Sequence, residues 1–242
     1  MITSFLSLIF FIGLTIFYSV VKFFVQRKNG NTLVKIVTII YFGLVIIGQF
    51  FLNIATTREL CGTMQPSIAF FYTFIPWIFI FGSIFFVLSF FPGWKIPFSN
   101  TFGYLITLLL GIKGLFHKML ETNIKNKMLQ NIYEDSSLLI NEFTPKNFDT
   151  MWNKLQASNI LNKDANNFRQ RFKDLVIIKD YVSESIWLIL SGMLIISISY
   201  NSINNSKCKK SLKSMEQEHR KWEVEKNKQV KKEKKPVYYV TD

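Results

Sequence analysis

The chain has 242 residues, of which 49% are hydrophobic, and its mean hydropathy is +0.21. These values are typical of a protein that combines membrane-spanning and aqueous parts, and they exclude a helical bundle that lies wholly in the membrane. The formal net charge is +13, unevenly distributed along the chain. Phe, Asn, Ile and Lys are abundant, as an AT-rich genome imposes, so part of the Phe and Lys excess carries no structural information.

Three apolar segments in the first half of the chain, residues 5–25, 33–55 and 68–91, predict membrane-spanning helices. The first lacks the positively charged start and the cleavage site of a signal peptide, so we interpret it as a retained anchor. The third holds 24 residues without a formal charge. As a helix it would be about 36 Å long, more than the ~30 Å hydrocarbon core of a bilayer. Pro76 is expected to kink this helix.

Two further apolar segments follow. Residues 181–200 form one of them, with Glu184 near its start. Residues 102–116 form the other and are apolar except for Lys113. The latter segment would reach only about 22 Å as a helix. Its length therefore leaves a re-entrant or interfacial segment open as an alternative to a span.

Charge placement favours a span over residues 102–116. Arg27 and Lys28 follow the first span with no acid nearby, and residues 207–242 hold twelve Lys or Arg against six Asp or Glu. The positive-inside rule places both basic regions in the cytosol. Four crossings between them put them on the same side of the membrane, whereas three do not. We therefore predict five spans, with the N-terminus outside and the tail in the cytosol.

The predicted fold class is all-α: a multi-pass transmembrane helical protein of about five spans, with a small helical extramembrane lobe and a basic C-terminal tail. Four segments follow from this interpretation: a four-span membrane region over residues 1–116, a polar helical lobe over residues 117–180, the fifth span over residues 181–200 and a basic cytosolic tail over residues 201–242.

Helix signals subdivide the predicted lobe. Apolar residues recur at helical spacing from Met119 to Ile132 and predict one amphipathic helix. Thr144 followed by Pro145 predicts the start of a second helix. A third helix is expected to begin near Asp164 and to continue without a break into the last span.

Cys61 and Cys208 are the only cysteines of the chain. The five-span topology puts them on opposite faces of the membrane, so we expect no disulfide within the chain. An intermolecular disulfide through Cys61 stays open. The ligands of a zinc site are absent from the sequence, and we expect neither a metal nor a cofactor.

Residue patterns typical of enzymes do not occur. His117 and His219 are separated by the bilayer in this topology, and the chain has no glycine-rich phosphate loop, nucleophile elbow or HExxH helix. Ser136 and Ser137 follow two acidic residues and are interpreted as the start of a helix rather than as nucleophiles. We predict that the protein is not an enzyme and has no catalytic residues.

The tail is predicted to be a basic arm with several alternative partners. It would bind anionic lipid head groups, an acidic protein surface, or nucleic acid without sequence preference. The candidate contact residues are Lys207, Lys209, Lys210, Arg220, Lys221, Lys231, Lys232, Lys234 and Lys235.

The most specific local sequence is FPGWKIPFSNTFGYL, residues 91–105. Pro and Gly at its start predict a turn where the third span ends, and its aromatic residues suit the head-group level of a membrane. The polar residues can cap the next helix, and the second Gly permits the close approach of another backbone. We predict an interfacial hairpin with the candidate residues Pro92, Gly93, Trp94, Phe98, Asn100, Phe102, Gly103 and Tyr104.

This segment resembles a motif of multi-pass membrane proteins of nucleocytoplasmic large DNA viruses, including algal and amoebal viruses. The preceding TRELCG sequence at residues 57–62 and the pair Pro76 and Trp77 fit the same pattern. The resemblance covers residues 57–105, under a quarter of the chain. It implies a virus-encoded protein of the internal virion membrane or of the host endomembranes that supply it.

The leading functional hypothesis is a non-enzymatic structural or assembly protein of a large DNA virus. It would anchor the internal virion membrane to capsid-associated proteins or to the core, and other membrane proteins or a second copy of the chain are further partners. The alternative is an oligomeric ion channel or small transporter, with a pore lined by Gln49, Asn53, Thr73 and Ser83. In that alternative Lys113 and Glu184 would pair along a transport path; otherwise each reaches a membrane interface.

Overall fold

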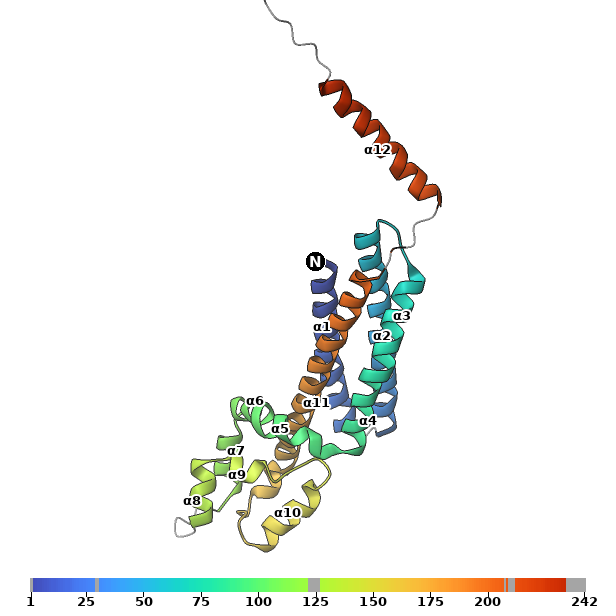
Figure 1. Cartoon of the computed structure of the whole chain (residues 1–242). Coiled ribbons are helices and arrows are strands. Elements are labelled where there is room, and N and C mark those ends of the chain that lie inside the picture. Colours follow the sequence, from blue (N-terminus) through green and yellow to red (C-terminus); the bar gives the residue numbers. More distant parts are fainter. Residues whose placement is uncertain (1, 29–30, 122–126, 207, 209–211, 234–242) are drawn as a thin grey trace, which may run out of the picture.

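The fold is known from a computed structural model that describes residues 2–28, 31–121, 127–206, 208 and 212–233. Every regular element in this part of the chain is a helix, and the only extended pairing is an isolated bridge between Leu120 and Leu161. Figure 1 shows a bundle of long helices with a lobe of shorter helices at one end. The prediction of an all-α membrane protein is confirmed.

Four long helical segments form the bundle. They are α1 (Ile2–Arg27), α2 (Asn31–Cys61), the continuous run of α3 (Pro66–Pro76), η1 (Trp77–Phe81) and α4 (Gly82–Phe90), and α11 (Ala165–Asn204). Each is long and apolar enough to cross a membrane. Their outer faces expose large apolar side chains such as Phe17, Ile39, Phe79 and Leu194. Such faces are suited to contact with lipid.

The disturbance expected at Pro76 takes the form of a π-helical turn. Pro76 has no N–H to donate, and the π-helical segment η1 begins at the next residue, Trp77. The helix then continues as α4 without a break. Trp77 and Phe81 of this turn are fully buried and pack against Phe11 of α1.

The expectation of a spanning helix over residues 102–116 is wrong. The chain there forms η3 (Ser99–Gly103), α6 (Tyr104–Leu109) and α7 (Ile112–Met119). Gly111, with φ +90°, interrupts the helix between α6 and α7. Ile112 and Phe116 are buried in the core of the lobe. The described residues therefore contain four helices that can cross a membrane, and not five.

The lobe has a core of its own. It is built from α7, α8 (Lys127–Glu134), α9 (Ser137–Ile140), α10 (Phe148–Ala157) and the first part of α11. Phe172 of α11 is fully buried at its centre. The ring of Phe172 has its centroid 4.7–6.3 Å from the ring centroids of Phe116, Phe143, Phe148 and Trp152.

Two of the three predicted lobe helices are corrected. The helix expected from Met119 to Ile132 is not continuous, because α7 ends at Met119, Leu120 is extended and α8 begins at Lys127. The second helix, α10, begins at Phe148 rather than at Pro145. Thr144 and Asn147 close the intervening turn, since the side-chain oxygen of each accepts from the backbone N–H of the other.

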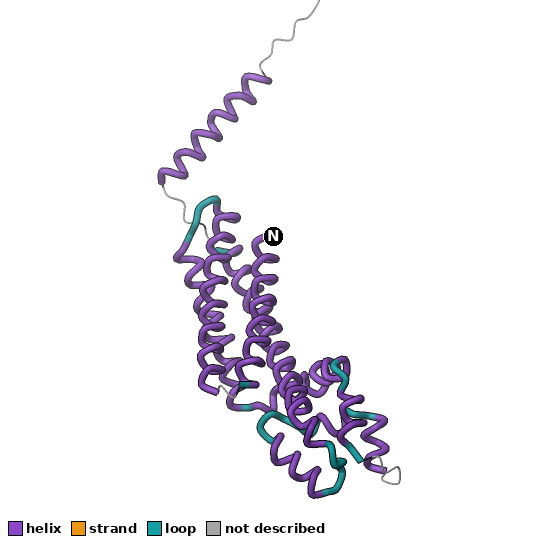
Figure 2. The backbone as a smooth tube through the Cα atoms, turned by 180° about the vertical axis from the view of Figure 1, so that it is seen from behind, coloured by secondary structure: helices purple, strands orange, loops and turns teal. Residues whose placement is uncertain are grey.

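The prediction of a helix that begins near Asp164 and continues into the last span is confirmed. The 40-residue helix α11 starts at Ala165, after its N-cap residue Asp164. At 1.5 Å per residue it is about 60 Å long, twice the thickness of a hydrocarbon core. Figure 1 shows this helix in both the bundle and the lobe, and Figure 2 shows the same bundle and lobe from behind.

A disulfide between Cys61 and Cys208 corrects the predicted topology. It joins the last residue of α2 to a residue four positions beyond α11. The hydroxyl of Thr3, in α1, donates to the Glu59 carboxylate at 2.7 Å. The N-terminus, both cysteines and the start of the tail therefore lie at one end of the bundle, with the lobe at the other (Figure 1). The prediction that the N-terminus and the tail lie on opposite sides of the membrane was wrong, because it depended on five crossings.

Candidate functional site

The segment between the third span and the lobe forms a junction against α11. It comprises η2 (Pro92–Lys95), α5 (Ile96–Phe98) and η3, where the sequence analysis expected an interfacial hairpin. The Trp187 indole N–H donates to the carbonyl oxygen of Trp94 at 2.8 Å, and the Ser183 hydroxyl donates to that of Lys95. The rings of Trp94 and Phe98 contact the Trp187 ring, with centroids 6.0 and 5.1 Å apart.

Gly103 brings the junction backbone close to α11. A Cβ atom at this position would lie 2.6 Å from the carbonyl oxygen of Lys179. Because this neighbour is backbone, it cannot move aside without shifting α11. A side chain larger than hydrogen is therefore excluded in this packing.

Some of the other residues of the predicted hairpin form hydrogen bonds, and others are exposed. The Asn100 side-chain oxygen accepts from the Lys179 ammonium at 3.3 Å, and the Tyr104 hydroxyl lies 3.1 Å from that of Ser136. Pro92, Gly93, Trp94 and Phe102 are exposed.

Four charged side chains form a neutral cluster that connects the junction to the bundle. The Lys95 ammonium lies 2.5 Å from a carboxylate oxygen of Asp180 and 3.7 Å from one of Glu184. The Lys22 ammonium, from α1, pairs with Glu184, and the Tyr18 hydroxyl donates to Glu184 at 3.3 Å. These side chains are largely withdrawn from solvent. A buried ion pair is expensive to break, because the remaining charge is left without compensation.

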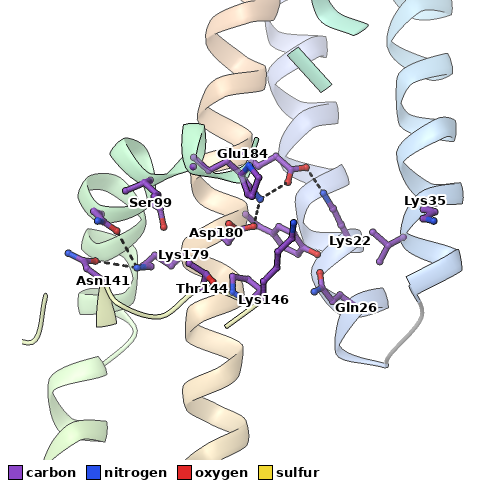
Figure 3. Close-up of a pocket in the computed structure, with 18 residues that line it drawn as sticks. Lys22, Gln26, Lys35, Ser99, Asn141, Thr144, Lys146, Lys179, Asp180 and Glu184 are labelled. Carbon is purple, nitrogen blue, oxygen red and sulfur yellow. Dashed lines mark hydrogen bonds and ion pairs between the residues drawn. The ribbon is translucent and has the colours of Figure 1, made fainter. Parts of the chain in front are cut away.

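Lys179 connects the junction to the lobe without a carboxylate partner. Its side chain is 2% exposed, and its ammonium donates to the carbonyl oxygen of Ile140 at 2.9 Å. It also donates to the side-chain oxygens of Asn100 and Asn141, at 3.3 Å each (Figure 3). The three acceptors are neutral, so the positive charge of Lys179 has no directly bonded counter-charge.

A cavity of about 690 Å³ lies beside these groups. Its walls come from the lobe-side ends of α1 and α2, the junction, the loop over residues 141–146 and α11. Figure 3 shows basic residues around it that belong to different elements. Its lysines are Lys22, Lys35, Lys95, Lys146 and Lys179, and its acids are Asp180 and Glu184.

Sequence reasoning singled out Glu184, but Lys113, the one partner considered for it in the transport alternative, is not its partner. Lys113 is exposed on α7, whereas Glu184 pairs with Lys22 and Lys95. The available signal was Lys22 itself, a single charge inside an otherwise apolar segment. Lys179 was missed, because a basic residue at the edge of an apolar segment is more often exposed at the interface.

The residues expected to line a channel form hydrogen bonds within the bundle instead. Gln49 and Asn53 of α2 are buried, and they bond to Ser7 of α1 and to Thr73 of α3. Hydrogen bonds of this kind hold helices together within a membrane. Ser83 is exposed, and its hydroxyl donates to a carbonyl oxygen of its own helix.

The structure describes four of the nine candidate contact residues of the tail. Arg220 and Lys221 are exposed on α12 (Leu212–Glu233), and Arg220 pairs with Glu216 at 3.7 Å. Lys231 and Lys232 also belong to this helix. The remaining candidates lie outside the described residues: Lys207, Lys209, Lys210, Lys234 and Lys235.

Histidines and acids do not gather into a metal site in the described part of the chain. His117 stacks on Tyr133 in the lobe, with centroids 4.8 Å apart, and His219 lies on α12. The interpretation of Ser136 and Ser137 as a helix start is confirmed, because α9 begins at Ser137 after its N-cap residue Ser136. The Asp135 carboxylate accepts from the Ser137 backbone N–H at 2.9 Å. Hydrogen bonding from Ser137 lowers the pKa of the Asp135 carboxyl below its usual value.

Comparisons with known proteins give no relative: no family model, curated protein or solved structure matches this chain.

Proposed function

We propose that the chain is a non-enzymatic membrane anchor, a structural or assembly protein of a large DNA virus that ties the internal virion membrane to capsid-associated proteins or to the core. The observation that carries this proposal is the continuity of α11, one helix that contributes to the core of the bundle and to that of the lobe. A continuous helix holds an aqueous lobe at a fixed position relative to the membrane.

The junction strengthens that attachment. Side chains from α1, the junction and α11 form the cluster around Glu184, and Lys179 connects α11 to the end of α9. An anchor needs a lobe that is attached to several helices, because the load from a partner bound to the lobe is then shared among them. The virus assignment is supported by the resemblance of residues 91–105, the segment that forms the junction.

The two aqueous parts leave the bundle at opposite ends, so one molecule can contact partners on both sides of a membrane. Disulfides persist in oxidising compartments, and the Cys61–Cys208 bond is therefore expected to face the lumen of host endomembranes during synthesis. The lobe then faces the cytosol. Arg27 and Lys28, at the lobe end, agree with the positive-inside rule in this orientation, whereas the basic tail, predicted to be cytosolic, then lies on the luminal side, against that rule.

An oligomeric channel is less well supported. Gln49, Asn53 and Thr73 would have to face a pore, but their side chains are used between the helices of one bundle. A pore between copies would need polar residues on the outer faces of the helices, and those faces are predominantly apolar.

Quantitative mass spectrometry of purified virus particles tests the anchor. We expect a high copy number, retention with the membrane fraction until detergent is added, and chemical cross-links from lobe lysines such as Lys154 and Lys163 to capsid-associated proteins. Absence from particles, with the protein left in membranes of infected cells, would overturn the proposal. A known abundant membrane protein of the same particles calibrates the copy number.

A further inference from the structure

The cavity at the junction carries more positive charge than its own acids can balance. Lys22 and Lys95 neutralise Glu184 and Asp180 through the ion pairs described above. Three of the five lysines around the cavity are left over, namely Lys35, Lys146 and Lys179. Within the described residues Lys35 and Lys146 form no ion pair, and both are exposed.

The position and size of the cavity indicate the kind of ligand. It opens between the lobe-side ends of α1 and α2, where the membrane-spanning part of the bundle meets the aqueous lobe. Its volume of about 690 Å³ is within the range of small-molecule sites. Lys35 and Lys146 belong to α2 and to the loop before α10, so a ligand between them meets donors from separate walls.

We infer that this cavity binds a phosphate group, held by Lys35 and Lys146. Ammonium groups from separate walls suit the oxygens of a phosphate, which accept charge-assisted hydrogen bonds from different directions. Lys179 contributes long-range attraction from behind Asn100 and Asn141. The phosphate belongs either to a lipid head group or to a free anion, since the cavity lies at head-group level. The site does not depend on the anchoring role.

Binding to the purified full-length chain tests the inference with two probes. The first is phosphatidic acid in phosphatidylcholine nanodiscs, with phosphatidylcholine alone as its reference, and retained lipid is measured by native mass spectrometry. The second is inorganic phosphate, added to the detergent-solubilised protein and measured by calorimetric titration. The double variant K35Q/K146Q should bind the preferred probe at least about tenfold more weakly, because two charge-assisted contacts are lost.

A matched control separates a built site from general attraction to a basic surface. The control K154Q/K163Q removes the same charge from exposed positions of the lobe that do not line the cavity, and should bind like the parent.

The outcomes distinguish the two sources of phosphate. Retention of phosphatidic acid alone assigns a lipid head group, and binding of inorganic phosphate assigns a free anion. The inference is overturned if neither probe binds, or if K35Q/K146Q binds as tightly as the parent or as the control K154Q/K163Q.

Discussion

The ammonium group of Lys22, in α1, pairs with the carboxylate of Glu184, in α11, near the lobe end of the bundle. These residues are 162 positions apart in the sequence, and both side chains are 11% exposed. The pair fixes the N-terminal helix to the helix that continues into the lobe. Its contribution is measurable, because a buried charge that loses its partner destabilises a protein strongly.

We therefore predict that E184Q lowers the free energy of unfolding by about 3–5 kcal/mol, since Lys22 loses its partner and Lys95 keeps only Asp180. Thermal unfolding in detergent, followed by circular dichroism, measures the change. E134Q removes an equivalent charge from an exposed position and should be neutral. Equal melting temperatures for E184Q and E134Q would contradict the cluster.

A second prediction concerns Gly103, which contacts the backbone of α11. G103A places a methyl group 2.6 Å from the Lys179 carbonyl oxygen, so the junction has to shift. We expect a loss of about 1–3 kcal/mol, as for other overpacked sites. G114A is a matched control, because Gly114 lies in α7 and has no heavy atom within 4 Å of its Cβ position. It should be neutral or slightly stabilising, since Ala favours the helix.

The spanning helices show where sequence reasoning succeeds, and residues 102–116 show where it stops. Hydropathy was enough to locate the spanning helices, because their residues face lipid over many turns. It misassigned residues 102–116, since apolar residues that pack in a lobe core look the same as residues that face lipid. The error reversed the side of the tail and separated Cys61 from Cys208. The partners of Glu184 depend on long-range packing, which no local pattern encodes.

The disulfide gives a third prediction. Cys61 and Cys208 should appear as one linked peptide when the membrane protein is digested without reductant and after free thiols are blocked. C61S/C208S should lose about 2–4 kcal/mol, because the bond closes a long loop. Quantitative alkylation of both thiols in unreduced membranes would contradict the bond. A disulfide-linked dimer through Cys61 would do so as well.

A fourth prediction concerns the number of crossings. With four spanning helices the two termini lie on the same side of the membrane, whereas five would separate them. Epitope tags are placed at both termini, and protease is added to sealed vesicles. We expect the protease to remove both tags or neither, with detergent-opened vesicles as the control. Removal of one tag while the other stays protected would restore the five-span topology.

The last prediction concerns the core of the lobe. Phe172 lies among the rings of Phe116, Phe143, Phe148 and Trp152, and its side chain is fully buried. F172A should cost about 3–5 kcal/mol, because truncation leaves a cavity between helices distant in sequence. Since α11 continues into the membrane, we expect the lobe to become sensitive to protease while the bundle stays intact. L138A, at a residue 53% exposed on α9, is the control and should leave digestion unchanged. Equal protection of F172A and the parent would mean that the lobe is held by the junction rather than by its own core.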